Sequence, residues 1–332
     1  MWTVRLIWKG LTMIVVTGGA GFIGSCLVKT LNDKGVHDIL IVDALGTTAK
    51  WKNLVGKKYL DVVHKTAFRK ELVEGEYGAE IEAIFHLGAC SATTEQNADY
   101  LLENNYRYSC DLAEYAEARN IRFIYASSAA TYGAGEKGYD DRTTDLKPLN
   151  MYGYSKQMFD EWVLRNGLIT KFVGVKFFNV FGPNEYHKGD MASVIMKSFR
   201  QVQESNIIRL FKSYKPEYAD GEQKRDFVYI KDVVETLYAM LQYGEISGIY
   251  NLGTGLARSW NDLAHAVFAA MKRTAIIEHI EMPLGLRSQY QYFTEADMSK
   301  LKETRIFKPC LSLEDAVQDY VSGYLAKDYA HY

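Results

Sequence analysis

The chain has 332 residues, 48% of them hydrophobic, which is enough to bury a sizeable core in one large domain or two adjoining ones. Its 39 Lys and Arg residues nearly balance its 41 Asp and Glu residues, so charge gives no reason to expect a nucleic-acid or membrane partner. Four widely spaced cysteines form no metal-binding pattern, and no apolar stretch approaches the ~18 residues of a membrane span. We therefore expect a cytoplasmic protein with reduced thiols and no bound metal.

The first predicted element is a strand over 13–17, followed by a glycine-rich turn and a helix predicted over 22–34. In such a turn Gly18 permits the tight bend, Gly21 lets the backbone approach a ligand, and Gly24 lets the helix pack closely on the strand. The N-terminus of the helix then presents free N–H groups to an anion. The turn therefore predicts a site for the pyrophosphate of a dinucleotide, although any tight strand-to-helix turn can use glycines.

A second strand is predicted over 38–43 and ends at Asp43. An acidic residue about 20 residues after the glycine turn is placed to accept hydrogen bonds from the adenosine ribose. Its charge repels a 2′-phosphate, so Asp43 alone favours NAD over NADP. The turn and Asp43 together predict that this half of the chain binds a dinucleotide.

Strand and helix patterns continue to alternate through the first half of the chain. The further strands are predicted over 59–63, 82–87, 121–126 and 172–178, and the further helices over 96–118 and 152–166. Near-continuous apolar runs of this kind are typical of parallel strands that are covered on both faces. Repeated strand–helix units predict an α/β fold with a doubly wound parallel sheet of the Rossmann type.

After Pro183 the pattern becomes mixed, with longer polar segments and one late apolar strand over 249–252. No repeat and no low-complexity linker separates the two halves, so we expect them to share an interface. The expected division is a dinucleotide-binding Rossmann domain over 13–182 with a return contribution near 226–255, a mainly substrate-binding mixed α/β domain over 183–332, and an N-terminal extension over 1–12.

Three polar residues suggest a catalytic centre beside the dinucleotide. Tyr152 and Lys156 are four residues apart at the start of a predicted helix, so they lie on one helical face. A neighbouring ammonium lowers the pKa of a phenol from its usual ~10, which would let Tyr152 take a proton near neutral pH. Ser128 follows the fifth strand, at the sheet edge where ligands bind. Each residue also has an ordinary structural interpretation, and it is their combination that predicts an enzyme.

These features resemble the extended short-chain dehydrogenase/reductase family. More detailed motifs resemble those of its nucleotide-sugar epimerases that act at C6 of ADP-heptose, and the likeness runs from Met13 nearly to the C-terminus. The motifs that carry it are 86–95, 125–133, 150–156, 178–183, 187–189 and 224–229. The runs Gly88-Ala89-Cys90-Ser91 and His187-Lys188-Gly189 are the more discriminating ones.

The resemblance implies an enzyme that interconverts the D-glycero and L-glycero forms of ADP-β-D-manno-heptose for lipopolysaccharide synthesis, and a homo-oligomer, with a pentamer suggested. Tyr152 would be one acid/base, Lys156 would hold the nicotinamide ribose and tune Tyr152, and Ser128 would hydrogen-bond the reacting oxygen. Lys188 would be a second acid/base on the other face of the sugar carbon. From the residues alone, the favoured interpretation of Lys188 is a solvated loop lysine.

The resemblance also implies two sets of binding residues. The expected cofactor set is Gly18, Gly21, Phe22, Ile23, Gly24, Asp43, Ala44, Lys50, Lys65, Leu87, Gly88, Ala89, Cys90, Ser91, Asn104, Lys156, Val180 and Lys188. The expected substrate set is Asn179, Asp190, Lys197, Phe211, Lys212, Ser213, Tyr214, Arg225 and Tyr290. Leu87, Asp190 and Lys197 depart from the family pattern, which leaves fine substrate selectivity open.

Two features of these sets bear on ligand chemistry. Arg225 suits the diphosphate of the substrate, because a guanidinium binds such oxygens bidentately. The resemblance places Lys50 and Lys65 near a 2′-phosphate, where two ammonium groups could outweigh the single carboxylate of Asp43. We therefore expect NADP as the cofactor, with NAD as the other possibility.

Two other functions stay open at this stage. The first is a related enzyme of the extended family, a 4-epimerase or a dehydratase that acts on another nucleotide sugar. A dehydratase usually needs an acidic residue beside the strand-end serine, where this chain has Ala129 and Ala130. The second is a non-catalytic NADP-binding regulatory protein, which would typically lack the pair formed by Tyr152 and Lys156.

Overall fold

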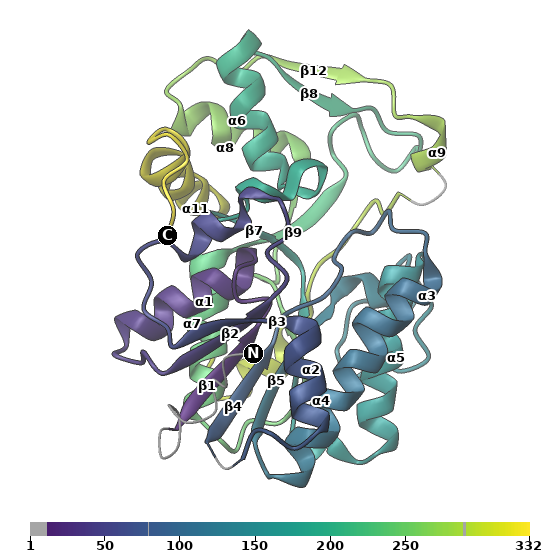
Figure 1. Cartoon of the computed structure of the whole chain (residues 1–332). Helices are drawn as coiled ribbons and strands as arrows, with labels where there is room; N and C mark the ends of the chain where they lie inside the picture. The colour runs from purple at the N-terminus through teal and green to yellow at the C-terminus, as the bar shows by residue number, and fades with distance from the viewer. Residues whose placement is uncertain (1–11, 79, 288–289) are drawn as a thin grey trace.

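The computed structural model describes residues 12–78, 80–287 and 290–332, so the predicted N-terminal extension lies outside the described residues apart from Thr12. Within these ranges the largest sheet has seven parallel strands in the order β10-β6-β5-β4-β1-β2-β3 (Figure 1). The strands are β1 (Met13–Thr17), β2 (Ile39–Asp43), β3 (Asp61–His64), β4 (Ile81–His86), β5 (Arg122–Ser128), β6 (Val173–Phe177) and β10 (Gly248–Leu252). The chain builds outward from β1 to β3 and then returns to β4 on the other side of β1, which confirms the predicted doubly wound α/β fold.

Helices cover both faces of this sheet (Figure 1). They are α1 (Phe22–Asp33), α2 (Lys65–Val73), α4 (Tyr108–Ala118), α5 (Met151–Arg165) and α7 (Ile230–Gln242). Successive side chains of a strand point to opposite faces. Ile14 and Val16 of β1 therefore share a hydrophobic cluster with α1 and α7, whereas Met13 and Val15 share another with α2, α4 and α5. Apolar side chains on both faces explain why the strands are near-continuous apolar runs.

The helix predicted over 96–118 is present but not regular. A π-helical turn, η3 (Leu102–Arg107), joins α3 (Ala98–Leu101) to α4. Asn105 lies in this turn, where its side-chain oxygen accepts a hydrogen bond from the backbone N–H of Cys90 (2.8 Å) and its amide donates to the Cys90 carbonyl (3.0 Å). The π turn thus holds the loop that follows β4, a common use of such turns near functional sites.

Smaller elements lie on one side of the large sheet, in the upper part of Figure 1. Two short sheets are ordered β11-β9-β7 and β12-β8. Their strands are β7 (Asn179–Phe181), β8 (Ile208–Phe211), β9 (Lys224–Tyr229), β11 (Ala257–Ser259) and β12 (Ile277–Ile280), and their larger helices are α6 (Val194–Ser205), α8 (Trp260–Ala270) and α11 (Leu313–Tyr320). Other short elements, not confined to that side of the sheet, are η2 (Ala49–Leu54), η4 (Ala129–Tyr132), η5 (Leu168–Thr170), η6 (Tyr186–Met191), α9 (Leu284–Arg287), α10 (Ser299–Lys302) and η7 (Val321–Leu325). The hydrophobic cluster around α1 and α7 continues into α6, α8 and α11.

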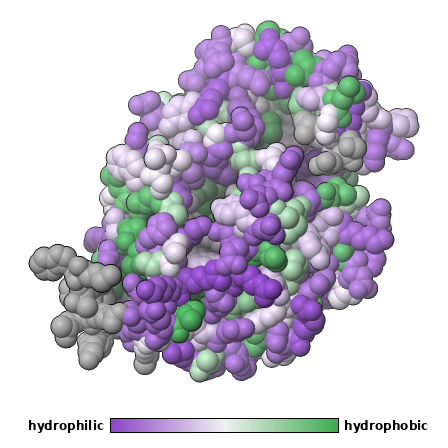
Figure 2. Space-filling view, turned by 45° about the vertical axis from the view of Figure 1, so that its right-hand side comes forward, coloured by the Kyte–Doolittle hydropathy of each residue, from purple (hydrophilic) through white to green (hydrophobic). Residues whose placement is uncertain are grey.

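The surface is mainly hydrophilic on the face drawn in Figure 2, where hydrophobic residues are scattered. Among the residues that the structure describes, no helix combines the length and the apolar character that crossing a membrane requires.

All four cysteines carry free thiols, and Cys26 and Cys110 are buried.

Candidate active site

A cavity of about 750 Å³ lies where the strands of the large sheet end. Thr17, Asp43 and Ser128 line it from β1, β2 and β5, and the loop after β4 lines it on the other side of β1. This is the place where the strand order reverses, at which open α/β sheets bind their ligands. Every residue of the expected cofactor set and all four expected catalytic residues line this one cavity.

Close packing explains the glycines of the turn after β1. Gly18 has a φ of +68°, and a Cβ added to it would lie 2.7 Å from the Cα of Gly88. A Cβ at Gly24 would overlap the carbonyl oxygen of Gly18. Only glycine fits at both positions, and the turn brings β1, the loop after β4 and the start of α1 into contact.

Asp43 is held at the glycine turn and is paired with a lysine. Its carboxylate accepts hydrogen bonds from the backbone N–H groups of Ala20 (2.9 Å) and Ala44 (2.7 Å), and the Lys50 ammonium lies 2.7 Å from it. Lys65 donates to the side-chain oxygen of Asn104 at 2.5 Å, and no carboxylate within the described ranges pairs with it. Burial lowers the pKa of Lys65, and the charge of Asp43 opposes this effect. The region therefore holds one carboxylate and two ammonium groups.

Ser128, Tyr152 and Lys156 meet where β5 ends and α5 begins. Ser128 closes β5 and accepts a hydrogen bond from the backbone N–H of Ala130 (3.1 Å), while Lys156 donates to the Ala126 carbonyl (2.8 Å). Burial lowers the pKa of Lys156 to about 8, and the charge of Asp160 opposes this shift. These contacts bring the three side chains together at one edge of the large sheet.

The pKa of Tyr152 is shifted in the direction opposite to the one expected. The pKa of the Tyr152 phenol is raised because burial disfavours the phenolate, and its hydrogen bond with Ser128 only partly offsets this. The prediction of a lowered pKa for Tyr152 is therefore wrong in direction, because burial of the phenol outweighs the contact that favours the phenolate.

Lys188 enters the cavity from a different element, η6, which follows β7. Its ammonium lies 5.4 Å from the centre of the Phe22 ring, at the start of α1. Burial lowers the pKa of Lys188, and the charge of Glu185 opposes this. Lys188 is therefore not a freely solvated lysine, and it faces the cavity from a direction unlike that of Tyr152.

A buried carboxylate fixes the segment that carries Lys188. Glu185 is fully buried and accepts hydrogen bonds from the backbone N–H and hydroxyl of Ser193 (both 2.6 Å) and from the hydroxyl of Tyr320 (3.0 Å). These contacts join both ends of η6 to helix α11. No local spacing in the sequence signals the contact with Tyr320, because it lies 135 residues after Glu185 in the chain.

Asn184 links the same segment to the glycine turn and to the end of the chain. Its amide donates to the hydroxyl of Ser25 (3.0 Å), and its side-chain oxygen accepts from the backbone N–H of Tyr332 (2.9 Å). The amide of Asn53 donates to the carbonyls of both Ala20 and Asn184 (3.0 Å each). The loop with Lys188 and the expected pyrophosphate site are therefore parts of one polar network.

The expected substrate residues are spread more widely. Asn179 lines the cavity, at the start of β7. Among the described residues, the members of the set that lie outside its lining are Asp190, Lys197, Phe211, Lys212, Ser213, Tyr214, Arg225 and Tyr290.

Arg225 lies close to the cavity through an aromatic neighbour. The guanidinium lies 5.6 Å from the ring centre of Trp260, which lines the cavity, and 5.2 Å from that of Tyr290. Arg225 is 7% exposed and donates to the backbone carbonyls of Lys224 (2.9 Å) and Gln291, and within the described residues it forms no ion pair. A buried guanidinium without a counter-ion is suited to an anionic ligand. Sequence reasoning did not identify Trp260, since nothing in the spacing of a lone tryptophan marks it.

The segment after β8 carries an exposed polar cluster. Lys212 pairs with Glu281 (2.8 Å), and the Tyr214 hydroxyl also hydrogen-bonds Glu281. The Arg287 guanidinium lies 3.6 Å from the ring centre of Tyr214. Elsewhere, Lys197 donates to the carbonyl of Asp190 (2.6 Å). In the described structure these side chains contact one another instead of lining the cavity.

Comparison with known proteins identifies the family to which this chain belongs. The model of the NAD dependent epimerase/dehydratase family matches residues 14–253. The ADP-L-glycero-D-manno-heptose-6-epimerase of Nitratidesulfovibrio vulgaris (strain Hildenborough) is 53% identical over 317 residues, which cover 95% of this chain and 98% of that protein. The protein of the same name from Fusobacterium nucleatum is 49% identical over 328 residues, covering 95% and 99%.

A solved structure gives the same match in three dimensions. The crystal structure of Helicobacter pylori ADP-L-glycero-D-manno-heptose-6-epimerase has a TM-score of 0.79 and 28% sequence identity, and the match covers 94% of this chain and 96% of that one.

Proposed function

Since this chain belongs to the NAD-dependent epimerase/dehydratase family, we propose that it is an isomerase that interconverts ADP-D-glycero-β-D-manno-heptose and ADP-L-glycero-β-D-manno-heptose. The proposal rests on sequence identity: this chain is 53% and 49% identical to two proteins named ADP-L-glycero-D-manno-heptose-6-epimerase, over nearly their whole length. The product would supply heptose to lipopolysaccharide. Incubation with one C6 epimer and analysis of the sugar that results tests the proposal.

The residues that line the cavity fit a mechanism of oxidation and reduction at C6. A bound nicotinamide ring would supply the acceptor and later the donor of a hydride. The glycine turn would hold its pyrophosphate, and Lys156 its ribose. Ser128 would donate a hydrogen bond to the oxygen on C6 and so keep the planar carbonyl in place.

Tyr152 and Lys188 would move the proton of the C6 hydroxyl. Burial raises the pKa of Tyr152 and lowers that of Lys188, so the phenol holds its proton more firmly and the ammonium releases its proton more readily. For one epimer, Lys188 would take the proton of the C6 hydroxyl, and after the carbonyl has turned Tyr152 would give a proton to its oxygen. Loss of a proton from Lys188 to solvent and uptake of one by Tyr152 would then restore both residues. For the opposite epimer the two residues would exchange roles, and the cofactor would be regenerated in each turnover, so no net redox change would occur.

We propose that NADP binds at least as tightly as NAD. The carboxylate of Asp43 is already paired with Lys50, and the ammonium of Lys65 has no carboxylate partner among the described residues, so the pair of lysines can receive a 2′-phosphate. Mass analysis of the cofactor released on denaturation is expected to find NADP. Lys65→Met should lower the affinity for NADP more than the affinity for NAD. Release of NAD alone, with equal effects of Lys65→Met on both cofactors, would contradict this preference.

We also propose that residues 13–182, with the return segment near 226–255, form a dinucleotide-binding domain and that 183–332 form mainly a substrate-binding domain. The protein would act in the cytoplasm as a homo-oligomer, and the resemblance suggests a pentamer. Light scattering during size-exclusion chromatography is expected to give about five times the mass of the chain, 37.8 kDa. A monomer mass at micromolar concentration would contradict this part of the proposal.

A further inference from the structure

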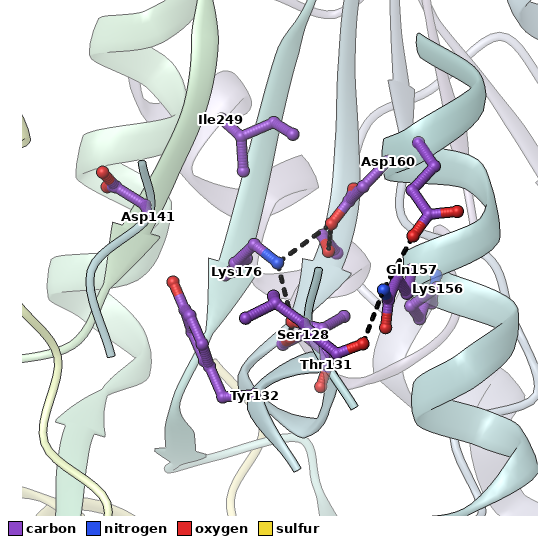
Figure 3. Close-up of polar contacts among 12 residues, drawn as sticks. Ser128, Thr131, Tyr132, Asp141, Lys156, Gln157, Asp160, Lys176 and Ile249 are labelled. Atoms are coloured by element: carbon purple, nitrogen blue, oxygen red, sulfur yellow. Dashed lines mark hydrogen bonds and ion pairs between the residues drawn. The ribbon is translucent and has the colours of Figure 1, made fainter. Parts of the chain in front are cut away.

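A buried ion pair lies behind the catalytic residues, outside the cavity lining (Figure 3). Asp160 of α5 and Lys176 of β6 lie 3.1 Å apart, and their side chains are 5% and 4% exposed. Removing two charges from water costs several kcal/mol per ion unless further hydrogen bonds satisfy them. Here the Asp160 carboxylate also accepts from the hydroxyls of Tyr125 (3.0 Å) and Ser127 (2.7 Å).

The same pair holds the backbone on both sides of Ser128. The Ser127 hydroxyl donates to Asp160, directly before Ser128 in the chain. On the other side, Lys176 donates to the Thr131 hydroxyl (2.6 Å), which donates to the carbonyl of Ser128 (2.8 Å). The ion pair therefore fixes the end of β5 from which Ser128 reaches the cavity.

Asp160 also lies one helical turn after Lys156 on α5, so the two side chains share a face. Burial lowers the pKa of Lys156 to about 8, and Asp160 is the main group that opposes this. Removing the negative charge of Asp160 would therefore change the fraction of Lys156 that is protonated near neutral pH. Lys176 acts on Lys156 indirectly, because it neutralises Asp160.

Other titratable groups surround Lys156 and must be considered. They are Tyr152 and Asp160 on α5, Cys90 in the loop after β4, His86 on β4 and Lys176 on β6. Burial and the charge of Lys156 lower the pKa of His86 to about 3, so His86 stays neutral near neutral pH. Burial raises the pKa of Tyr152, which keeps the phenol neutral as well. Among the groups that oppose the effect of burial on Lys156, Asp160 is accordingly the largest, ahead of Cys90.

We propose that Asp160 and Lys176 are positioning residues of this epimerase, which together fix Ser128 and set the protonation of Lys156. Neither touches the cavity, so neither is a catalytic residue. The inference rests on the proposed function only in the roles given to Ser128 and Lys156.

The two charges can be removed separately, and the expected effects have opposite signs. Asp160→Asn removes the anion and leaves the Lys176 cation, so Lys156 loses its proton at lower pH. We expect the alkaline limb of the pH profile of kcat/KM to report the loss of the Lys156 proton, so this limb should move to lower pH by about one unit. Lys176→Met leaves Asp160 without its neutralising partner. Lys156 should then keep its proton up to a higher pH, and the alkaline limb should move to higher pH. Lys176→Arg keeps the charge and should keep the wild-type limb.

Cofactor affinity gives a second readout that does not need turnover. Fluorescence titration with reduced cofactor should show the same opposite shifts, because protonated Lys156 would hold the ribose. Lys171→Met is the matched control, since Lys171 forms an exposed ion pair with Glu117 (2.6 Å) close to β6. It should leave both pH profiles unchanged. Should Asp160→Asn not fold, the direction of the Lys176→Met shift decides alone.

Three results would overturn the proposal. Folded Asp160→Asn and Lys176→Met proteins whose profiles coincide with that of the wild type would show that the pair is merely structural. If the alkaline limb moves in the same direction in Asp160→Asn and Lys176→Met, the charge of the ion pair is not the cause of the shift. A shifted limb in Lys176→Arg, which keeps the charge, would lead to the same conclusion. An inactive wild-type protein would instead refute the proposed function, and the cofactor titrations would still test the ion pair.

Discussion

Replacement of Tyr152 by phenylalanine is expected to lower the rate of epimerisation by roughly 10²-fold or more, the usual contribution of a positioned acid or base. The variant loses the hydroxyl that hydrogen-bonds Ser128 but keeps the ring and its packing. The turn at Gly18 and the pairing of Asp43 with Lys50 lie on other elements, so cofactor affinity should persist. Steady-state kinetics and cofactor titration on the same sample measure the two effects.

Tyr154→Phe is the matched control for this substitution. Tyr154 is on the same helix but is 49% exposed and does not line the cavity. Its variant should epimerise at the wild-type rate. If Tyr152→Phe is also nearly as active as the wild type, Tyr152 is a packing residue and the proposed proton transfer is incorrect.

The second large effect is expected for Lys188→Met, which should reduce epimerisation by a similar factor, roughly 10²-fold. Inversion moves the hydride off one face of C6 and back to the other, so the sugar oxygen points in different directions in the two steps. Proton transfer needs about 2.6–3.2 Å between heavy atoms, which one fixed phenol does not provide at both positions. Lys188 enters the cavity from η6, whereas Tyr152 enters from α5.

Single-turnover experiments with each C6 epimer distinguish two bases from one. Tyr152→Phe and Lys188→Met should each slow the formation of reduced cofactor from a different epimer. Lys70→Met, at a lysine that is 73% exposed on α2, should affect neither. If both active-site variants slow the same epimer, or if Lys188→Met is harmless, Tyr152 serves both faces and Lys188 has no catalytic role.

Much of the fold follows from local features of the sequence. The glycine turn, the apolar runs and the helix that starts near Tyr152 are each encoded within a short segment. Parallel strands bring their carboxyl ends to one sheet edge, so residues placed at those ends meet even when they are far apart in the sequence. This is why the expected cofactor set, from Gly18 to Lys188, lines one cavity.

Features that depend on long-range contacts were not predictable in this way. The direction of the Tyr152 pKa shift depends on the burial of the phenol in the packed fold. The network around Glu185 joins η6 to α11, and the ion pair of Asp160 with Lys176 joins a helix to a strand. Spacing along the chain carries no information on such contacts, because only the packed fold brings the partners together.

The most direct test of the proposed activity is incubation of the purified protein with ADP-D-glycero-β-D-manno-heptose, followed by chromatography and NMR of the sugar. We expect a mixture of the D-glycero and L-glycero forms that differ only at C6, with no net change in the redox state of the cofactor. Recovery of unchanged substrate, inversion at another carbon, or loss of water from the sugar would contradict the proposed 6-epimerase activity.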